Sequence, residues 1–353
     1  MTAAGLGLWA AITIAVAGPA ASPEYLPVHL AQAGGYFVQE KLEVTLKVER
    51  SEGDAALALA RGRADIAATS LDAAYRLGHV AGAPPLLFFG LTAAPPVALL
   101  VSPSHKDTVR SPSDLRGQPV GLPGIGTPEQ AMLATILSRA NVKVHHVPLR
   151  TFSNRGLAGA LGQGEVAAAV MADPWITRLV AVRGAAEGET SAGVAVRGAA
   201  EGETRAGKEG MASILVDLRT RSDAARWLGA ETVHAALFVR AEGRPADQEL
   251  AALVRALLRA AAKLAEAPAE ALASILPAAV TGQPDDFALR VAGARQSYLP
   301  RGLVTEDMLK ASVAQARERS PFPAAVKLPW WRSAPLLLTR PLERAADAEP
   351  PPR

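Results

Sequence analysis

Short apolar runs alternate with helical patterns along most of the chain. Strands are expected at 12–17, 42–48, 64–69, 84–91, 97–102, 120–122, 142–147, 165–171, 213–218 and 235–240. Helices are expected between them, at 26–33, 55–61, 70–79, 131–140 and 154–161. From Ala246 onward the pattern is mostly helical. Strands that alternate with helices predict an α/β fold, with mostly parallel sheets flanked by helices.

The segment Val120–Gln130 predicts a strand, a glycine turn and the start of a helix. Gly124 and Gly126 permit close backbone approach, and Thr127 is a good N-cap residue. The free N–H groups of such a turn are suited to a polar or anionic ligand group, although a well-capped helix would have the same pattern. Because Glu129 stands where a third glycine would fall, a dinucleotide fingerprint is not expected.

Composition narrows the function classes. The 353 residues are 49% hydrophobic and 20% charged, as expected of a globular protein. Lys+Arg 37 against Asp+Glu 34 gives a net charge of +3, which is too balanced to suggest a nucleic-acid partner. The absence of cysteine excludes disulfides, thiolate metal sites and cysteine nucleophiles.

No catalytic constellation, cofactor motif or metal site is expected from the sequence. His145 and His146 are adjacent on an expected strand, so their side chains would point to opposite faces and are not expected to share a metal ion. No Ser-His-Asp arrangement or phosphate-binding Walker loop is present.

The N-terminus has two interpretations. Leu6–Val16 is apolar like a signal-peptide core, and Ala15-Val16-Ala17 is similar to a cleavage site, but no Lys or Arg precedes Lys41. Alternatively, Ile12–Ala17 is the first core strand, which cleavage after Ala17 would delete. We favour the strand, with the export signal absent from this sequence or replaced.

A tandem repeat interrupts the α/β pattern. Ala181–Thr190 recurs as Ala195–Thr204 with no apolar periodicity, so residues 181–208 are expected to be a flexible insertion without a necessary function. Residues 341–353, which end in a proline-rich stretch, are expected to be a tail.

Three features together resemble a known family. The chain opens with ITIAVAGPAASPEYLPVHLAQAGGYFVQEKLEVTL, continues with ALARGRADIAATS, and later carries SPSDLRGQPVGLPGIGTPEQAML before EVAAAVMADPW. This succession resembles the substrate-binding proteins of ABC importers for nitrate, sulfonates, taurine and thiamine-precursor pyrimidines. The resemblance covers residues 11–180 well and 211–340 loosely.

The resemblance implies a two-lobed periplasmic-binding-protein-like fold of type II. Lobe 1 would comprise 11–96 and 241–340, and lobe 2 would comprise 103–234. The hinge strands would be 97–102 and 235–240. In that family a ligand is bound in the cleft between the lobes, which close over it by hinge motion. It further implies an ABC permease and an ATPase as partners, and a periplasmic or extracytoplasmic monomer.

Candidate ligand residues follow the expected strands, because ligands gather beyond the carboxyl ends of parallel strands. They are, for lobe 1, Ser22, Glu24, Tyr25, Glu52, Asp54, Thr69 and Ser70, and, for lobe 2, Gly124, Gly126, Thr127, Asp173 and Trp175. Helix capping is the competing explanation for Thr127, Asp173, Ser70, Glu52 and Asp54. Core or lobe packing is the competing explanation for the rings of Tyr25 and Trp175.

The candidate loops contain carboxylates but no Arg or Lys, so we expect a neutral or amine-bearing, partly aromatic ligand and not a strong anion. The leading hypothesis is the substrate-binding component of an ABC importer for a small organic solute. The alternative is an enzyme of the thiamine-pyrimidine or menaquinone-pathway type on the same fold. A transcription-regulator effector domain is a third option, but no helix-turn-helix precedes the first strand.

Overall fold

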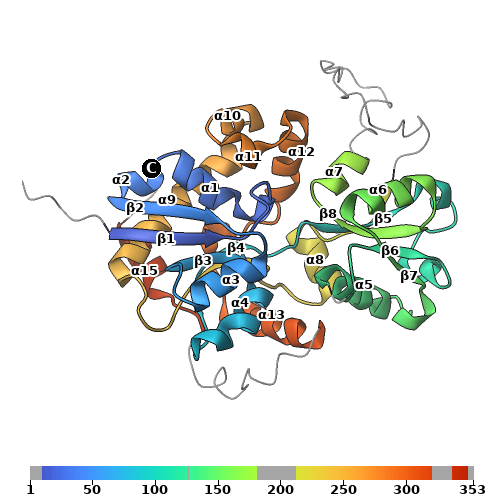
Figure 1. The fold of residues 1–353 in the computed structure, drawn as a ribbon, viewed down its shortest axis with the longest axis horizontal. Helices are drawn as coiled ribbons and strands as arrows, with labels where there is room; N and C mark the ends of the chain where they lie inside the picture. Colours follow the sequence, from blue (N-terminus) through green and yellow to red (C-terminus); the bar gives the residue numbers. More distant parts are fainter. Residues whose placement is uncertain (1–9, 126, 181–211, 320–335, 349–353) are drawn as a thin grey trace, which may run out of the picture. The chain divides into compact units, whose positions relative to one another are not determined.

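The computed structural model describes residues 10–125, 127–180, 212–319 and 336–348 (Figure 1). The chain divides into two compact units: unit 1 is formed by residues 1–96 and 218–353, and unit 2 by residues 97–217. The repeat at 181–208 and Gly126 lie outside the described residues. Residues 218–234, which the sequence analysis assigned to lobe 2, belong to unit 1.

Unit 1 is built on a five-stranded sheet in the order β2-β1-β3-β10-β4. The strands are β1 (Ala10–Val16), β2 (Leu42–Val48), β3 (Ile66–Ser70), β4 (Leu86–Thr92) and β10 (Ala235–Val239). β1 pairs parallel with β2 and β3, whereas β10 pairs antiparallel with both β3 and β4. The existence of β1 confirms the strand interpretation of the N-terminal apolar run.

Helices cover both faces of this sheet. The helices of unit 1 are, in chain order, α1 (Leu26–Ala33), α2 (Tyr36–Gln39), α3 (Glu52–Ala60), α4 (Leu71–Leu77), α8 (Arg221–Leu228), α9 (Asp247–Glu266), α10 (Ala269–Ala273), α11 (Ala278–Thr281), α12 (Pro284–Ala294), α13 (Glu306–Arg319) and α15 (Arg340–Ala348). Figure 1 shows α1 on one side of the sheet and α4 and α13 on the other.

Alternate side chains of β10 pack against helices on the two faces of the sheet. Leu237 and Val239 lie in one hydrophobic cluster with residues of α1, α9 and α12. Ala236 and Phe238 point to the opposite face and lie in a second cluster with residues of α4 and α13. Because both faces of β10 are covered, every residue of this strand is buried, which explains its continuous apolar sequence.

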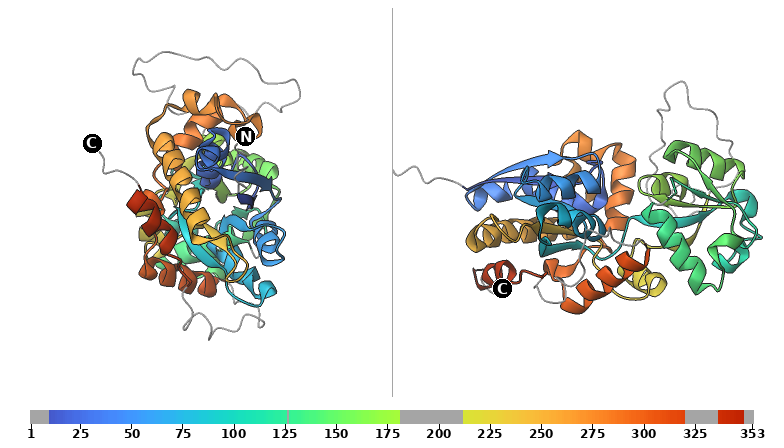
Figure 2. Two further views of the ribbon diagram at one scale, coloured as in Figure 1. Left: turned by 90° about the vertical axis from the view of Figure 1, so that its left-hand side faces the viewer. Right: turned by 60° about the horizontal axis from the view of Figure 1, so that its bottom comes forward.

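The segment expected to be a C-terminal tail contains a packed helix. α15 packs against α9, and its Ala345 is fully buried (Figure 2). α9 buries the apolar stripe that includes Leu250, Leu253 and Leu257. The tail prediction is therefore wrong for residues 341–348, because the many polar residues of α15 hide the apolar face that the helix buries against α9.

Unit 2 has a second five-stranded sheet, in the order β7-β6-β8-β5-β9. Its strands are β5 (Val97–Val101), β6 (Val120–Leu122), β7 (Leu149–Thr151), β8 (Ala168–Ala172) and β9 (Ser213–Asp217). β6 pairs parallel with β7 and β8, whereas β5 is antiparallel to β8 and β9. The flanking helices include α5 (Pro128–Arg139), α6 (Asn154–Gln163) and α7 (Trp175–Val180).

One expected strand is not formed. Within Val142–Val147, residues Val144–His146 form a short 3-10 helix. The strand of this region is β7, which begins after that helix, at Leu149. His145 and His146 consequently lie side by side with their ring centroids 4.3 Å apart, not on opposite faces of a strand. None of the helices in the described part of the chain combines the length and the apolar character needed to cross a bilayer.

Candidate functional site

Polar side chains gather at one edge of the unit 1 sheet. Glu24 lies in the 3-10 turn Pro23–Tyr25 that follows β1, Glu52 is the first residue of α3, and Ser70 is the last residue of β3. His234 directly precedes β10. Because β10 runs antiparallel to its neighbours, its beginning lies at the edge where β3 ends, and His234 joins the other three.

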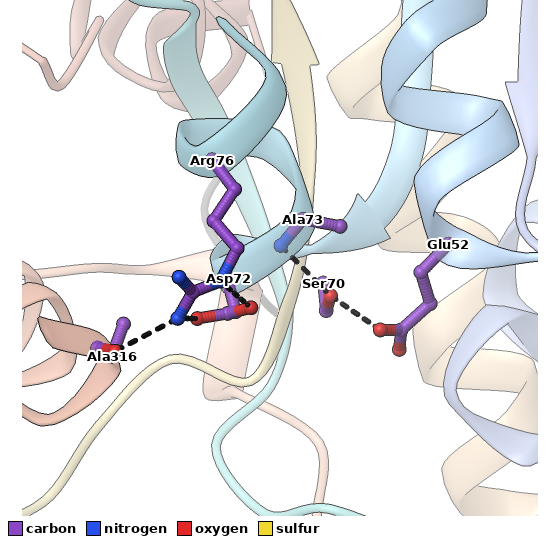
Figure 3. Close-up of polar contacts among 6 residues, drawn as sticks. All are labelled: Glu52, Ser70, Asp72, Ala73, Arg76 and Ala316. Carbon is purple, nitrogen blue, oxygen red and sulfur yellow. Dashed lines mark hydrogen bonds and ion pairs between the residues drawn. The ribbon is translucent and has the colours of Figure 1, made fainter. Parts of the chain in front are cut away.

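Glu24, Glu52 and His234 form a compact group, called here the acidic cluster. One side-chain ligand atom from each residue lies within 4.8 Å of those of the other two. Glu24 Oε1 is 3.7 Å from His234 Nε2. The Ser70 hydroxyl donates a hydrogen bond of 2.6 Å to Glu52 Oε2 and also accepts from the N–H of Ala73, so it holds the Glu52 carboxylate while it caps α4 (Figure 3).

Two buried oxygen atoms beside the acidic cluster lack a hydrogen-bond partner among the described residues. They are Glu24 Oε2 and the hydroxyl oxygen of Tyr25. Glu24 is only 7% exposed and Tyr25 only 1%. Since buried polar atoms are nearly always hydrogen-bonded in folded proteins, two such atoms at one place suit a polar ligand or a water molecule.

Burial changes the acid–base chemistry of the site. It raises the pKa of the Glu52 carboxyl, with a further increase from the charges of Glu24 and Asp72, whereas His234 and the Ser70 hydroxyl act in the opposite direction. Burial also raises the pKa of Tyr25 well above its usual value, and the charges of Glu52 and Glu24 add to that effect. The site therefore favours a ligand that brings positive charge or hydrogen-bond donors.

The main chain fixes the positions of these side chains. His234 accepts a hydrogen bond from the N–H of Leu71 and donates one to the carbonyl of Thr92, each 2.8 Å long. The loop before Glu24 is held from another side, where Arg290 of α12 donates to the carbonyl of Ala21 and the Tyr298 hydroxyl donates to that of Pro23 at 2.7 Å.

The other unit 1 candidates make local contacts. The Thr69 hydroxyl donates to the main-chain carbonyl of Glu52, which fixes the start of α3. Asp54 accepts from the hydroxyl of Ser51, the N-cap of that helix. Ser22 precedes the 3-10 turn without a capping hydrogen bond from its side chain. The structure thus brings Glu24, Tyr25, Glu52 and Ser70 together. By contrast, the side chains of Thr69 and Asp54 make hydrogen bonds at the start of α3, and that of Ser22 caps no helix.

The unit 2 candidates lie beyond the ends of β6 and β8, which are adjacent parallel strands. Thr127 caps α5, with Oγ1 accepting from the N–H of Gln130 and donating to the carbonyl of Gly124. Asp173 accepts from both the N–H and the hydroxyl of Thr177 at the start of α7. These contacts confirm the capping interpretation for both residues.

Trp175 is half-buried in unit 2. It packs against the unit's hydrophobic cluster, and the guanidinium carbon of Arg178 lies 5.3 Å from its ring centroid. Ligand contacts by Gly124, Thr127, Asp173 and Trp175 stay predictions. The same role for Gly126 falls outside the described residues.

His234 is the site residue that sequence reasoning missed. The sequence analysis searched only the carboxyl ends of expected strands, and His234 stands before a strand. A signal was nevertheless present, because a polar residue directly before the apolar run Ala235–Val239 reaches the same sheet edge if that run is antiparallel.

Comparison with known proteins assigns the chain to a family. The family model described as NMT1/THI5 like matches residues 22–271, which is more than half of the chain. The chain belongs to the NMT1/THI5-like family. That match spans the acidic cluster, from Glu24 to His234. No curated protein sequence matches the chain.

Solved structures share the fold of this NMT1/THI5-like chain. The alkanesulfonate-binding protein SsuA of Xanthomonas axonopodis pv. citri, bound to MOPS, is 17% identical, with 94% of this chain and 98% of that chain covered and a TM-score of 0.61. The periplasmic aliphatic sulphonate-binding protein SsuA of Escherichia coli is 15% identical, with 88% and 90% covered and a TM-score of 0.63.

A third similar structure is the ligand-binding component of an ABC-type import system from Staphylococcus aureus, solved with zinc bound. It is 12% identical, with 89% of this chain and 94% of that chain covered and a TM-score of 0.58. These structural neighbours are importer binding proteins, and they confirm the two-lobed periplasmic-binding-protein fold expected from the sequence.

Proposed function

We propose that this protein is the substrate-binding component of an ABC importer, and that it captures a small organic solute for delivery to a permease and its ATPase outside the cytoplasm. The observation that carries the proposal is the NMT1/THI5-like family match over residues 22–271. The shared fold of the importer binding proteins over 88–94% of this chain supports it.

The acidic cluster supports a neutral or amine-bearing solute. Glu24 and Glu52 place two carboxylates at the site, and the unit 1 candidates include no Lys or Arg. With no cation bound to the cluster, a sulfonate or nitrate placed beside these carboxylates would be repelled by both, and the buried position of Glu24 would strengthen the repulsion. The chemistry at this edge therefore differs from what an anion-binding protein requires.

A ligand screen tests the proposal. The purified full-length chain is heated with a panel of amine-bearing and nitrogen-heterocyclic metabolites, and separately with taurine, nitrate and alkanesulfonates. We expect a higher melting temperature with members of the first group, because a ligand that binds only the folded state stabilises it. Stabilisation by taurine or nitrate alone would overturn the proposed solute class.

An enzyme on the same fold is the second candidate. The observation that favours it is the raised pKa of Glu52 in a cluster with His234, since carboxyl groups with a raised pKa are common where protons are transferred. Mass spectrometry of each stabilising compound after incubation with the protein separates the two. An unchanged compound supports a binding protein, whereas a new product with a stoichiometry above one per chain supports an enzyme.

A further inference from the structure

The acidic cluster has the composition and spacing of a metal site. We propose that Glu24, Glu52 and His234 bind a divalent transition-metal ion, with Zn²⁺ as the matching probe. Imidazole nitrogen and carboxylate oxygen are both common zinc ligands. This inference rests on the geometry of the cluster and not on the proposed function.

The distances in the cluster suit a shared ion better than direct contacts. Glu24 Oε1 and His234 Nε2 are 3.7 Å apart, which is longer than an ordinary hydrogen bond of about 2.7–3.2 Å. Two ligands on one tetrahedral zinc ion, each about 2.0–2.2 Å from it, lie about 3.3–3.6 Å apart. Because the three ligand atoms already lie within 4.8 Å of one another, small side-chain rotations bring all of them to one ion.

Charge also favours a divalent ion. Glu24 is 7% exposed, and a charge of −2 on these two carboxylates is costly without compensation. One divalent cation balances both carboxylates, whereas a single ammonium group leaves one of them unbalanced. The neutral form of His234 supplies a lone pair, which suits a metal ion as the third ligand.

The surroundings resemble the outer shell of a metal site. Ser70 donates to Glu52 Oε2 and thereby orients this carboxylate, and the two main-chain hydrogen bonds of residue 234 fix the backbone that carries the imidazole. The unpartnered Glu24 Oε2 and the Tyr25 hydroxyl are polar groups beside the ion, suited to a metal-bound water. With three protein ligands, a tetrahedral ion keeps one open position, which suits a water or an amine nitrogen of the solute.

Zinc titration of the full-length chain tests the inference. The protein is stripped with EDTA, dialysed, and titrated with ZnCl₂ in a calorimeter. We expect one ion per chain and a higher melting temperature with zinc. Loss of an outer-shell partner weakens metal binding roughly 10- to 100-fold. We expect a larger loss of zinc affinity in each of the three ligand variants, Glu24→Gln, Glu52→Gln and His234→Gln. Ser70→Ala should weaken zinc binding within that roughly 10- to 100-fold range.

A matched control addresses the other histidines. His145 and His146 are adjacent in unit 2 and could hold zinc at its surface. The double variant His145→Asn/His146→Asn should bind zinc like the unaltered protein. If this variant loses zinc while the three cluster variants keep it, the acidic cluster is not the site and the inference fails.

Cobalt provides a readout that does not depend on variant stability. Co²⁺ added to the stripped, unaltered protein should give visible absorption bands of a tetrahedral nitrogen–oxygen site, and zinc should displace it. Absence of both Zn²⁺ and Co²⁺ binding in protein that is folded by circular dichroism overturns the inference. Repeating the solute screen on stripped and zinc-loaded protein distinguishes the two proposals. If a solute binds but zinc does not, only the metal site is contradicted. If zinc binds but no solute does, only the importer function is contradicted.

Discussion

At the scale of single residues, His29 shows how strongly burial alone controls a titratable group. This histidine of α1 is 6% exposed, and its Nε2 has no hydrogen-bond partner among the described residues. Burial lowers the pKa of His29 from 6.5 to about 4, because the charged imidazolium is disfavoured away from water. The folded protein therefore contains neutral His29 at every pH above that value.

This pKa shift predicts a loss of stability in mild acid. The unfolded chain binds the His29 proton near pH 6.5 and the folded chain only near pH 4, so the free energy of unfolding falls as the pH drops through this window. The contribution lost by pH 4 is about 3 kcal/mol. Urea denaturation of the unaltered protein and of His29→Leu between pH 4 and 7 measures it. A difference between the two proteins that does not change with pH would contradict the assignment.

Residues of the candidate site differ in how far the sequence predicted them. Glu24, Glu52 and Ser70 were predicted because they follow parallel strands, and the structure places them together. His234 was not predicted, because the direction of β10 depends on its pairing with β3 and β4 and not on its own apolar sequence. The sequence shows which residues follow an expected strand. It does not show which residue of another strand will lie beside them, because that depends on how the strands pair.

At the scale of elements, α12 holds together parts of unit 1 that are distant in sequence. Its Arg290 is 2% exposed and donates to the carbonyl of Ala21 before the acidic cluster and to that of Thr281 at the end of α11. Arg295, just after the helix, donates instead to the carbonyls of Leu264 and Ala267 near the end of α9. Arg290 thus holds the loop before the acidic cluster and the end of α11, whereas Arg295 holds the end of α9.

Replacing each arginine by methionine separates their roles. Arg290→Met and Arg295→Met should each destabilise the protein by about 1–3 kcal/mol per buried carbonyl left without a donor. Hydrogen exchange should differ between them, with faster exchange of peptides covering residues 19–25 in Arg290→Met only. Equal exchange of these peptides in both variants would show that Arg290 does not hold this loop.

The element pattern was predictable wherever strand and helix periods differed clearly. The apolar runs that form β3, β5 and β10 and the amphipathic stripe of α9 are of this kind. Val142–Val147 failed because its apolar residues alternate with polar ones as in a strand, while the chain turns there before Pro148. The hydrogen bond from Gly117 N–H to the His146 carbonyl is a tertiary contact that local sequence does not reveal.

At the scale of the whole molecule, the two units differ in whether one or two segments of the chain form them. Unit 2 is one continuous segment, Val97–Asp217, with its own sheet and a hydrophobic cluster formed only by its own residues. Unit 1 needs two segments that flank unit 2 in the sequence. The sequence analysis expected this two-part arrangement but placed the second boundary later than Asp217.

The continuity of unit 2 predicts that it folds alone. A fragment of residues 97–217 should show a cooperative thermal transition and a dispersed amide spectrum, because its core and all of its strands are present. A fragment of residues 10–96 should show neither, since it lacks β10 between β3 and β4. Cooperative unfolding of the 10–96 fragment would contradict this dependence on β10.

The central place of β10 also sets an order of events during synthesis. β3 and β4 leave the ribosome with a gap between them that stays open until Val239 has emerged, which is after the described strands of unit 2 have been synthesised. We expect the middle of the polypeptide to become native before its beginning, the reverse of the usual amino-terminal lead. Until then, the unpaired edges of β3 and β4 are exposed to neighbouring chains, so chaperone demand should be greatest in that interval.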